Sequence, residues 1–111
     1  MRGEDDLTHD EHARRLRRRV IETGDTPREL RVGALDWADG EETLPEPHRT
    51  LVDQVVRDSA RVTDAQVAAV LEDLGSQATT FEVIMSASIG AGLHRWRAAE
   101  RAIRMADDAS S

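Results

Sequence analysis

Apolar residues recur at spacings of three and four along residues 79–105, which is the pattern of one face of a long helix. The large ones are Phe81, Ile84, Met85, Ile89, Leu93, Trp96 and Ile103. At 1.5 Å per residue, a helix of this length runs roughly 40 Å, longer than a domain of 111 residues needs. We therefore expect the rest of the chain to be organised around this helix.

The same spacing over shorter stretches predicts four further helices. Three of them span about residues 9–23, 27–38 and 64–74, and each is followed within two residues by a glycine, the usual residue just past a helix end. The remaining helix lies between the second and the last of these. Its apolar residues are Leu51, Val52, Val55, Val56 and Ala60.

Threonine opens four T-x-x-E/Q capping boxes, at Thr8, Thr26, Thr63 and Thr79. In a capping box the Thr hydroxyl and the side chain three residues later each accept a hydrogen bond from a backbone amide in the first turn. Pro27 strengthens the second box, because proline suits the first helical position. The four boxes are interpreted as four helix starts.

Residues 39–47 hold acidic residues and two prolines and are expected to form a loop. No run of alternating β-branched residues predicts a strand. The predicted fold is an all-α bundle of four to five helices with a long C-terminal helix, forming one domain over residues 9–107 whose halves are separated by that loop. Residues 1–8 are expected to be a flexible N-terminal tail, and residues 108–111 a disordered C-terminus.

Composition limits both the core and the chemistry. One Phe, two Trp and no Tyr make a thin core, which a second copy of the chain would complete. All 15 basic residues are Arg, against 22 acidic residues, and a net charge of −7 disfavours membranes and nucleic acids as partners. The absence of Cys excludes disulfides, thiolate metal ligands and Cys nucleophiles.

The longest uncharged run, residues 83–93, is about half of what a membrane span needs. The N-terminus shows no apolar leader segment. The protein is expected to be soluble and cytoplasmic, with no membrane partner.

Two glycines interrupt the long helix, at positions 90 and 92. A glycine inside a helix costs about 1 kcal/mol relative to alanine, so both require a reason. The favoured interpretation is that another helix crosses there at close range. A ligand approaching the bare backbone and a kink are the alternatives.

Residues 60–103 resemble a known family. The matching positions are Val62, Thr63, Asp64, Val67, Leu71, Gly75 and Glu82, followed by small residues over 87–92. This pattern is similar to the C-terminal part of AhpD-like proteins of the carboxymuconolactone decarboxylase superfamily, and residues 44–64 resemble the lead-in of short members. The resemblance implies an all-helical fold and interlocked homo-oligomers.

The same resemblance implies either peroxidase chemistry on a Cys-x-x-Cys pair with nearby His and Glu, or decarboxylation of lactone acids. This chain lacks cysteine, so a thiolate peroxidase cycle is excluded. Glu82 and His94 are the candidate catalytic residues for the second chemistry. They lie twelve residues apart, roughly 18 Å along one helix, and would meet only across an oligomer interface. The alternative for Glu82 is the capping acid of Thr79.

Two further groups are candidates for binding. His9 and His12, at i and i+3, could hold a divalent metal with a nearby carboxylate, or they could be solvated residues of a first helical turn. The arginines of segment Arg14–Arg19 could contact phosphates or pair with the chain's own acids. His48 is expected to be a surface residue without a partner.

We therefore expect a non-catalytic or degenerate AhpD-like protein that acts through homo-oligomeric assembly or beside a catalytic partner chain, with no cofactor. The predicted contact surface consists of Phe81, Met85, Ile89, Gly92, Leu93 and Trp96. One alternative is a cysteine-free, decarboxylase-like or metal-assisted enzyme using His and Glu. The other is a nucleic-acid or regulator-binding module using the Arg14–Arg19 helix, although the long helix offers no Arg before Arg95 to read bases.

Overall fold

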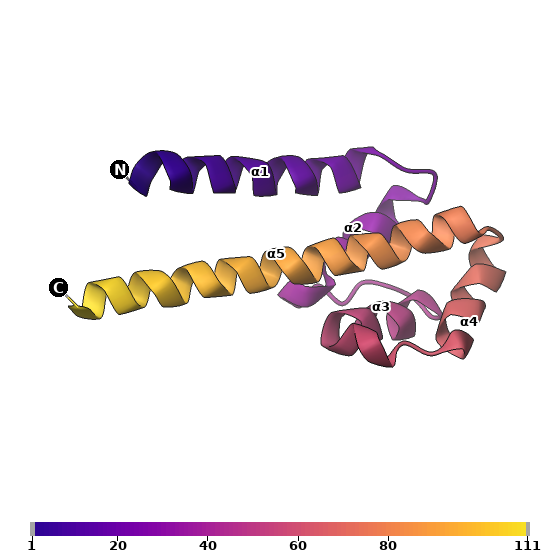
Figure 1. Ribbon diagram of the computed structural model, residues 1–111. Coiled ribbons are helices and arrows are strands. Elements are labelled where there is room, and N and C mark those ends of the chain that lie inside the picture. Colours follow the sequence, from indigo (N-terminus) through magenta and orange to yellow (C-terminus); the bar gives the residue numbers. More distant parts are fainter. Residues whose placement is uncertain (1, 111) are drawn as a thin grey trace.

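The computed structural model describes the backbone of residues 2–110 and the side chains of residues 9–110. Over that range the chain is helical and contains no strand, so the predicted all-α fold with a long C-terminal helix is confirmed (Figure 1). The α-helices are α1 (Arg2–Glu22), α2 (Arg28–Asp36), α3 (His48–Asp58), α4 (Asp64–Leu74) and α5 (Gln77–Ser110). The single-turn 3-10 helices are η1 (Trp37–Asp39) and η2 (Ser59–Arg61).

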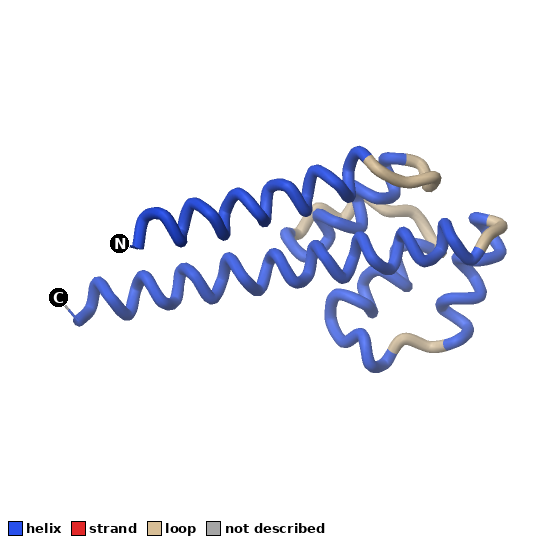
Figure 2. The backbone as a smooth tube through the Cα atoms, turned by 45° about the horizontal axis from the view of Figure 1, so that its top comes forward, coloured by secondary structure: helices blue, strands red, loops and turns tan. Residues whose placement is uncertain are grey.

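Helix α5 is the element on which the others pack. Helices α2, α3 and α4 gather around its N-terminal half, and α1 runs antiparallel beside it (Figures 1 and 2). The radius of gyration is 16.0 Å, against about 13 Å for a compact domain of this length. The excess arises because α1 and the C-terminal half of α5 extend beyond the core as a helical pair.

The core face of α5 is made of small side chains. Val83, Ala87, Gly90 and Ala91 are buried there. Around them pack larger residues from the other elements, of which Leu35, Leu51, Val52 and Val70 are fully buried. The small-residue patch predicted at 87–92 is therefore divided, because Ala87, Gly90 and Ala91 face the protein's own core while Ser88 and Gly92 are exposed.

The two glycines of α5 have different surroundings. A Cβ atom on Gly90 would lie 2.0 Å from the backbone carbonyl oxygen of Leu35, so α2 crosses α5 at a distance that only glycine permits. This confirms the predicted close helix crossing at Gly90. A Cβ atom on Gly92 would meet nothing within 4 Å. No described part of this chain crosses at Gly92, and a crossing there by another chain stays a prediction.

The capping box at Thr63 is confirmed. Its hydroxyl accepts from the amide of Gln66 at 3.2 Å, and the Gln66 side chain accepts from the amide of Thr63 at 3.0 Å. Gly75 ends α4 in a left-handed conformation with φ 80°, which glycine adopts without steric cost. The predicted start and end of α4 are both correct.

The other predicted boxes do not form helix starts. Helix α5 begins at Gln77 instead of Thr79, because the hydroxyl of Ser76 accepts from the Thr79 amide at 3.1 Å. Pro27 occupies the N-cap position of α2 without a side-chain hydrogen bond, and Thr26 is buried against α5.

Two helices are longer than predicted. Thr8 lies inside α1, which begins at Arg2, and the Thr8 side chain lies outside the described side chains. Helix α5 continues to Ser110, past the predicted domain end at residue 107. The flexibility expected of residues 1–8 and 108–111 stays a prediction, and residues 1 and 111 lie outside the described backbone.

The crossing at Gly90 yields a stability prediction. We expect Gly90→Ala to lower the free energy of unfolding by about 3 kcal/mol, because the added methyl group would overlap a backbone carbonyl that cannot rotate away. Urea unfolding followed by circular dichroism measures this change.

The matched control is Gly92→Ala at low protein concentration. Its new methyl group meets open space, so the substitution should stabilise α5 by up to about 1 kcal/mol through helix propensity. Similar destabilisation by both substitutions would contradict the crossing.

Candidate functional site

The face of α5 opposite the core is apolar and exposed. We call it the outer face; its residues are Phe81, Met85, Ser88, Gly92, Trp96, Ala99 and Ile103, and all seven are exposed. Phe81 and Ile103 expose 60% and 61% of their surface, which is far more than a core residue would. The only polar side chain, Ser88, donates its hydroxyl to the Ile84 carbonyl at 2.9 Å. The face carries no charge, although 33% of the chain is charged.

The spacing along the outer face is symmetric about Gly92. Moving outward in either direction, the next positions lie four, seven and eleven residues away. The residue at the centre is the exposed glycine whose Cβ position is empty. A helical face with this spacing reads the same in both chain directions.

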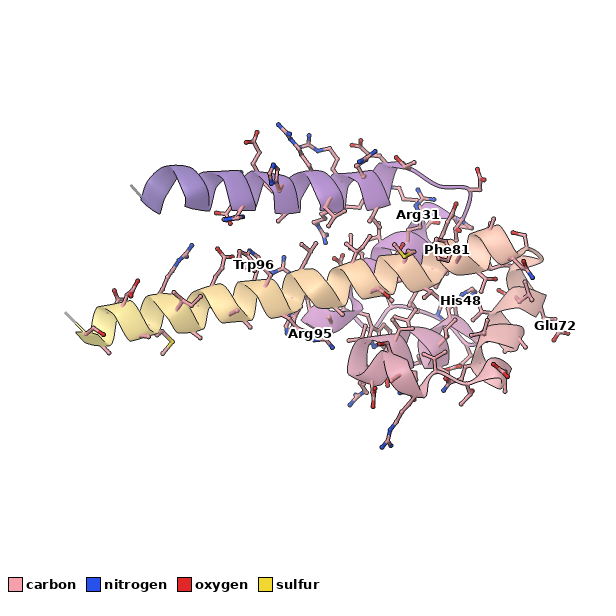
Figure 3. The ribbon with its side chains drawn as sticks, viewed as in Figure 1. Arg31, His48, Glu72, Phe81, Arg95 and Trp96 are labelled. Atoms are coloured by element: carbon pink, nitrogen blue, oxygen red, sulfur yellow. The ribbon has the colours of Figure 1, made fainter. Side chains whose placement is uncertain are left out.

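The structure distributes the predicted contact surface over two sides of α5. Phe81, Met85, Gly92 and Trp96 lie on the outer face. Ile89 and Leu93 are half-buried and lie toward α1, where they line two cavities between α1 and α5. Figure 3 shows Phe81 and Trp96 along the same long helix.

Glu82 holds the turn between α1 and α2. Its carboxylate accepts from the Asp25 amide at 2.9 Å, from the Thr26 amide at 2.8 Å, and also from the Thr26 hydroxyl. The prediction that Glu82 serves Thr79 as a capping acid is therefore wrong, because backbone amides of a distant turn take that carboxylate. Its three acceptor contacts give it a structural role.

Arg31 completes this junction from the other side. It is 6% exposed, and its guanidinium donates to the carbonyls of Val20 and Ile21 at 3.0 and 2.9 Å and to that of Thr26. A cation suits these carbonyls, because the C-terminal end of a helix carries partial negative charge. No local pattern indicated this burial, since Arg31 sits one residue after Leu30 in an amphipathic stretch.

The surroundings of Glu82 also set its protonation. Burial raises the pKa of Glu82, but the hydrogen bonds from Asp25 and Thr26 and the charge of Arg31 outweigh it, so the pKa lies below the ordinary glutamate value. A general acid or base acts best with a pKa near the working pH. The pKa of Glu82 is instead lowered, which moves it away from neutral pH.

The second predicted catalytic residue, His94, lies elsewhere. Its Nδ1 is 2.8 Å from a carboxylate oxygen of Asp39 in η1, and Arg97 donates to the same carboxylate at 3.0 Å. Burial raises the pKa of Asp39, but the hydrogen bond from His94 and the charge of Arg97 lower it below the ordinary value. Glu82 lines a cavity with Leu16, and His94 is not among the residues around it. The structure does not bring the two candidates together within one chain.

The predicted metal ligands point to different surroundings. The His9 ring packs on Trp96 with centroids 5.5 Å apart, and His12 is exposed on α1. Within the described part of the chain, no group of three or more His, Asp or Glu residues is arranged to hold a metal ion.

The arginines of α1 divide between pairing and exposure. Arg15 pairs with Glu11 on the same helix at 3.1 Å, and Arg17 reaches Asp36 of α2 at 2.6 Å. The hydrogen bond to Asp36 raises the pKa of Arg17 above its ordinary value. Arg14 and Arg17 also line a cleft between α1 and α5. The segment is thus neither a free phosphate-binding face nor fully neutralised.

His48 contradicts its prediction as a surface residue. The residue, labelled in Figure 3, is 2% exposed, and its Nε2 lies 2.8 Å from a carboxylate oxygen of Asp73, which joins α3 to α4. The buried Nδ1 has no hydrogen-bond partner among the described atoms. Because the partner lies 25 residues away, no local pattern in the sequence could have indicated this contact.

No protein-family model matches this chain, and neither a curated protein nor a solved structure matches it. The resemblance to AhpD-like proteins therefore rests only on the residues quoted for it.

Across residues 2–110, none of the helices combines the length and the apolar character that crossing a bilayer requires.

The Glu82 junction predicts a pH-dependent stability. Replacing the charged acceptor by Glu82→Gln should lower the free energy of unfolding at pH 7 by about 2 kcal/mol, the size of a hydrogen bond to a charged group. Because the folded-state pKa is depressed, this stabilisation is present above the unfolded pKa and is lost as the pH falls through the folded value. The gap between wild type and variant should therefore narrow from pH 7 to pH 3 in urea titrations.

Glu72→Gln is the matched control, because Glu72 is an exposed glutamate of α4. It should change stability by less than about 0.5 kcal/mol at either pH. A gap for Glu82→Gln that stays constant with pH would refute the charge-based role of the carboxylate.

Proposed function

We propose that this protein acts through self-assembly, with two copies packing the outer faces of α5 against each other in antiparallel orientation. The observation that carries the proposal is the outer face itself: seven exposed, uncharged positions placed symmetrically about Gly92. A two-fold interface requires one surface patch to be complementary to itself. The exposed positions of this face have the same spacing in both chain directions, so two copies can pair in antiparallel orientation with every position facing another.

Antiparallel pairing about Gly92 places large side chains opposite small ones. Trp96 meets Ser88 of the second copy, Met85 meets Ala99, and Gly92 meets its own copy at the axis. Phe81 and Ile103, the two most distant positions, meet at both ends of the contact. Facing positions that alternate in size allow two helices to interdigitate.

This arrangement explains why a glycine occupies position 92 inside α5. Inside one chain its cost in helix stability has no compensation, because nothing lies near it. Two α5 helices that cross at Gly92 can approach through bare backbone, as α2 approaches α5 at Gly90. The contact from position 81 to 103 extends over roughly 33 Å, which allows burial of the four exposed large apolar side chains of each copy.

The family resemblance supports the same function. AhpD-like proteins are homo-oligomers, and this chain carries no cysteine for their peroxidase chemistry. We propose a non-catalytic member that serves as an assembly unit, alone or beside a catalytic partner chain. The enzyme alternative has less support, because Glu82 accepts hydrogen bonds from the α1–α2 turn and His94 is hydrogen-bonded to Asp39. The nucleic-acid alternative weighs less because Arg15 and Arg17 are paired with acids.

A charge swap across the axis tests the pairing. Phe81→Lys alone and Ile103→Glu alone should each raise the dissociation constant of the dimer at least tenfold, because each places two charges, one from each copy, against apolar residues. The double variant F81K/I103E should recover at least half of that loss in free energy, since the introduced charges face each other twice across the two-fold axis. Native mass spectrometry and sedimentation equilibrium measure both effects.

The same pair of charges placed off the outer face is the control. Ala98→Lys with Ala102→Glu adds an exposed lysine and glutamate to α5 without touching the outer face, and it should leave dimerisation unchanged. A wild-type protein that is monomeric at concentrations up to about 100 μM would refute the proposal; this affinity corresponds to roughly 5 kcal/mol. A dimer unaffected by the single substitutions would refute the interface.

A pair of cysteines locates the axis without adding a side chain at Gly92. The chain has no cysteine of its own, so M85C/A99C has no background reaction. Antiparallel pairing about Gly92 sets position 85 of one copy against position 99 of the other, whereas the two positions lie about 21 Å apart within one helix, too far for a disulfide inside one chain. Mild oxidation should therefore give dimer crosslinking on non-reducing gels. M85C/A98C, whose second position is exposed on another side of α5, should crosslink much more slowly. Equal rates would refute an axis at Gly92.

A further inference from the structure

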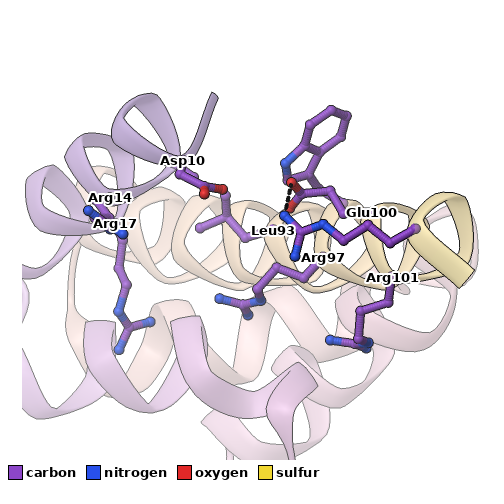
Figure 4. Close-up of a pocket in the computed structure, with 10 residues that line it drawn as sticks. Asp10, Arg14, Arg17, Leu93, Arg97, Glu100 and Arg101 are labelled. Atoms are coloured by element: carbon purple, nitrogen blue, oxygen red, sulfur yellow. Dashed lines mark ion pairs between the residues drawn. The ribbon is translucent and has the colours of Figure 1, made fainter. Parts of the chain in front are cut away.

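A cleft of about 360 Å³ lies between α1 and the C-terminal half of α5 (Figure 4). We call it the α1–α5 cleft. Five arginines line it, two from α1 and three from α5: Arg14, Arg17, Arg97, Arg101 and Arg104. Among the residues whose side chains the structure describes, the acids in its lining are Asp10 and Glu100, so these residues carry a surplus of three positive charges on a chain of net charge −7.

Part of this positive charge has no ion-pair partner among the residues whose side chains are described. Arg17 is held by Asp36 at 2.6 Å, Arg97 by Asp39 at 3.0 Å, and Arg104 lies 3.7 Å from Glu100. Arg14 and Arg101 form no ion pair with any described residue, and they come from opposite walls of the cleft. Figure 4 shows these two arginines at opposite ends of the cleft, and a guanidinium of this kind can bind one carboxylate through two parallel N–H donors.

The rest of the lining is apolar. Ala13, Leu93 and Trp96 lie between the arginines, and Trp96 exposes 41% of its surface. An inorganic anion would form ion pairs with the guanidiniums but leave the apolar side chains exposed to water. A neutral apolar compound would cover the surface and leave the guanidiniums without an acceptor. Only a molecule that carries both features satisfies the whole lining.

We propose that the α1–α5 cleft binds an organic anion with an apolar body, of the class of medium-chain or aromatic carboxylates. The carboxylate binds one of the two guanidiniums at the ends of the cleft, Arg14 or Arg101, and the apolar body packs on Leu93 and Trp96. The cavity volume falls within the range of small-molecule sites, which are largely apolar with a few convergent polar groups. The site goes beyond the proposed assembly, since neither arginine belongs to the outer face.

Octanoate at low salt is the test compound, with calorimetry and Trp fluorescence as the measurements. Trp37 is 6% exposed and donates to Asp53 at 2.9 Å, so a fluorescence change reports on Trp96, and Trp96→Phe should abolish it. We expect a dissociation constant below about 1 mM, which corresponds to roughly 4 kcal/mol. Removing both free guanidiniums with R14A/R101A should weaken binding by at least tenfold, the size of a lost charge-assisted contact.

The control variant is R28A/R61A, which removes two exposed arginines elsewhere and changes the net charge equally. It should alter the octanoate affinity by less than about twofold, because distant surface charges are screened. The control compounds are octan-1-ol, which lacks the charge, and acetate, which lacks the chain. Both should bind at least tenfold more weakly than octanoate.

Four outcomes would overturn the proposal: no octanoate binding at about 1 mM, equal binding of octan-1-ol, equal binding of acetate, or an equal loss in R28A/R61A. Each is independent of the assembly tests, because Phe81, Gly92 and Ile103 do not line the cleft. A monomeric wild type that binds octanoate would refute the assembly and support the cleft. A dimer that does not bind octanoate would do the reverse.

Discussion

The contact on which this structure depends is the crossing of α2 over α5, where the Leu35 carbonyl lies so close to Gly90 that no side chain fits between them. Because the two backbones meet there, the face of α5 toward the core must be small, and Ala87 and Ala91 continue it on the neighbouring turns. Ile84 packs against the edge of this core. The other large residues of α5 lie on the outer face or toward α1, where the proposed functions are located.

A second junction fixes α1 relative to this core. Glu82 of α5 takes the backbone amides of Asp25 and Thr26, while Arg31 of α2 takes the last carbonyls of α1. Backbone amides and carbonyls thus form hydrogen bonds with both of these charged side chains. Without such partners, burying the charges would cost free energy. These contacts hold α1 antiparallel beside α5 and thereby create the α1–α5 cleft (Figures 2 and 4).

The outer face and the cleft meet at Trp96. One side of α5 carries uncharged residues placed symmetrically about Gly92, and the adjoining side lines the cleft with Leu93, Arg97 and Arg101. Trp96 is exposed on the first and lines the second. A ligand in the cleft would therefore contact the same indole ring that the second copy covers. The dimer depends further on Phe81 and Ile103, whereas the cleft depends on its arginines.

Sequence periodicity determined that the chain is all helical, that α4 runs from Asp64 to Leu74, and that α5 is unusually long. These features are local, since a repeat of three to four residues and a cap such as that of Thr63 are complete within one element. Only the tertiary structure decided which face of α5 is buried, because small and large apolar residues both recur there at helical spacing. It also decided the partners of Glu82, Thr26 and His48, since each partner lies at least 25 residues away, where local spacing carries no information.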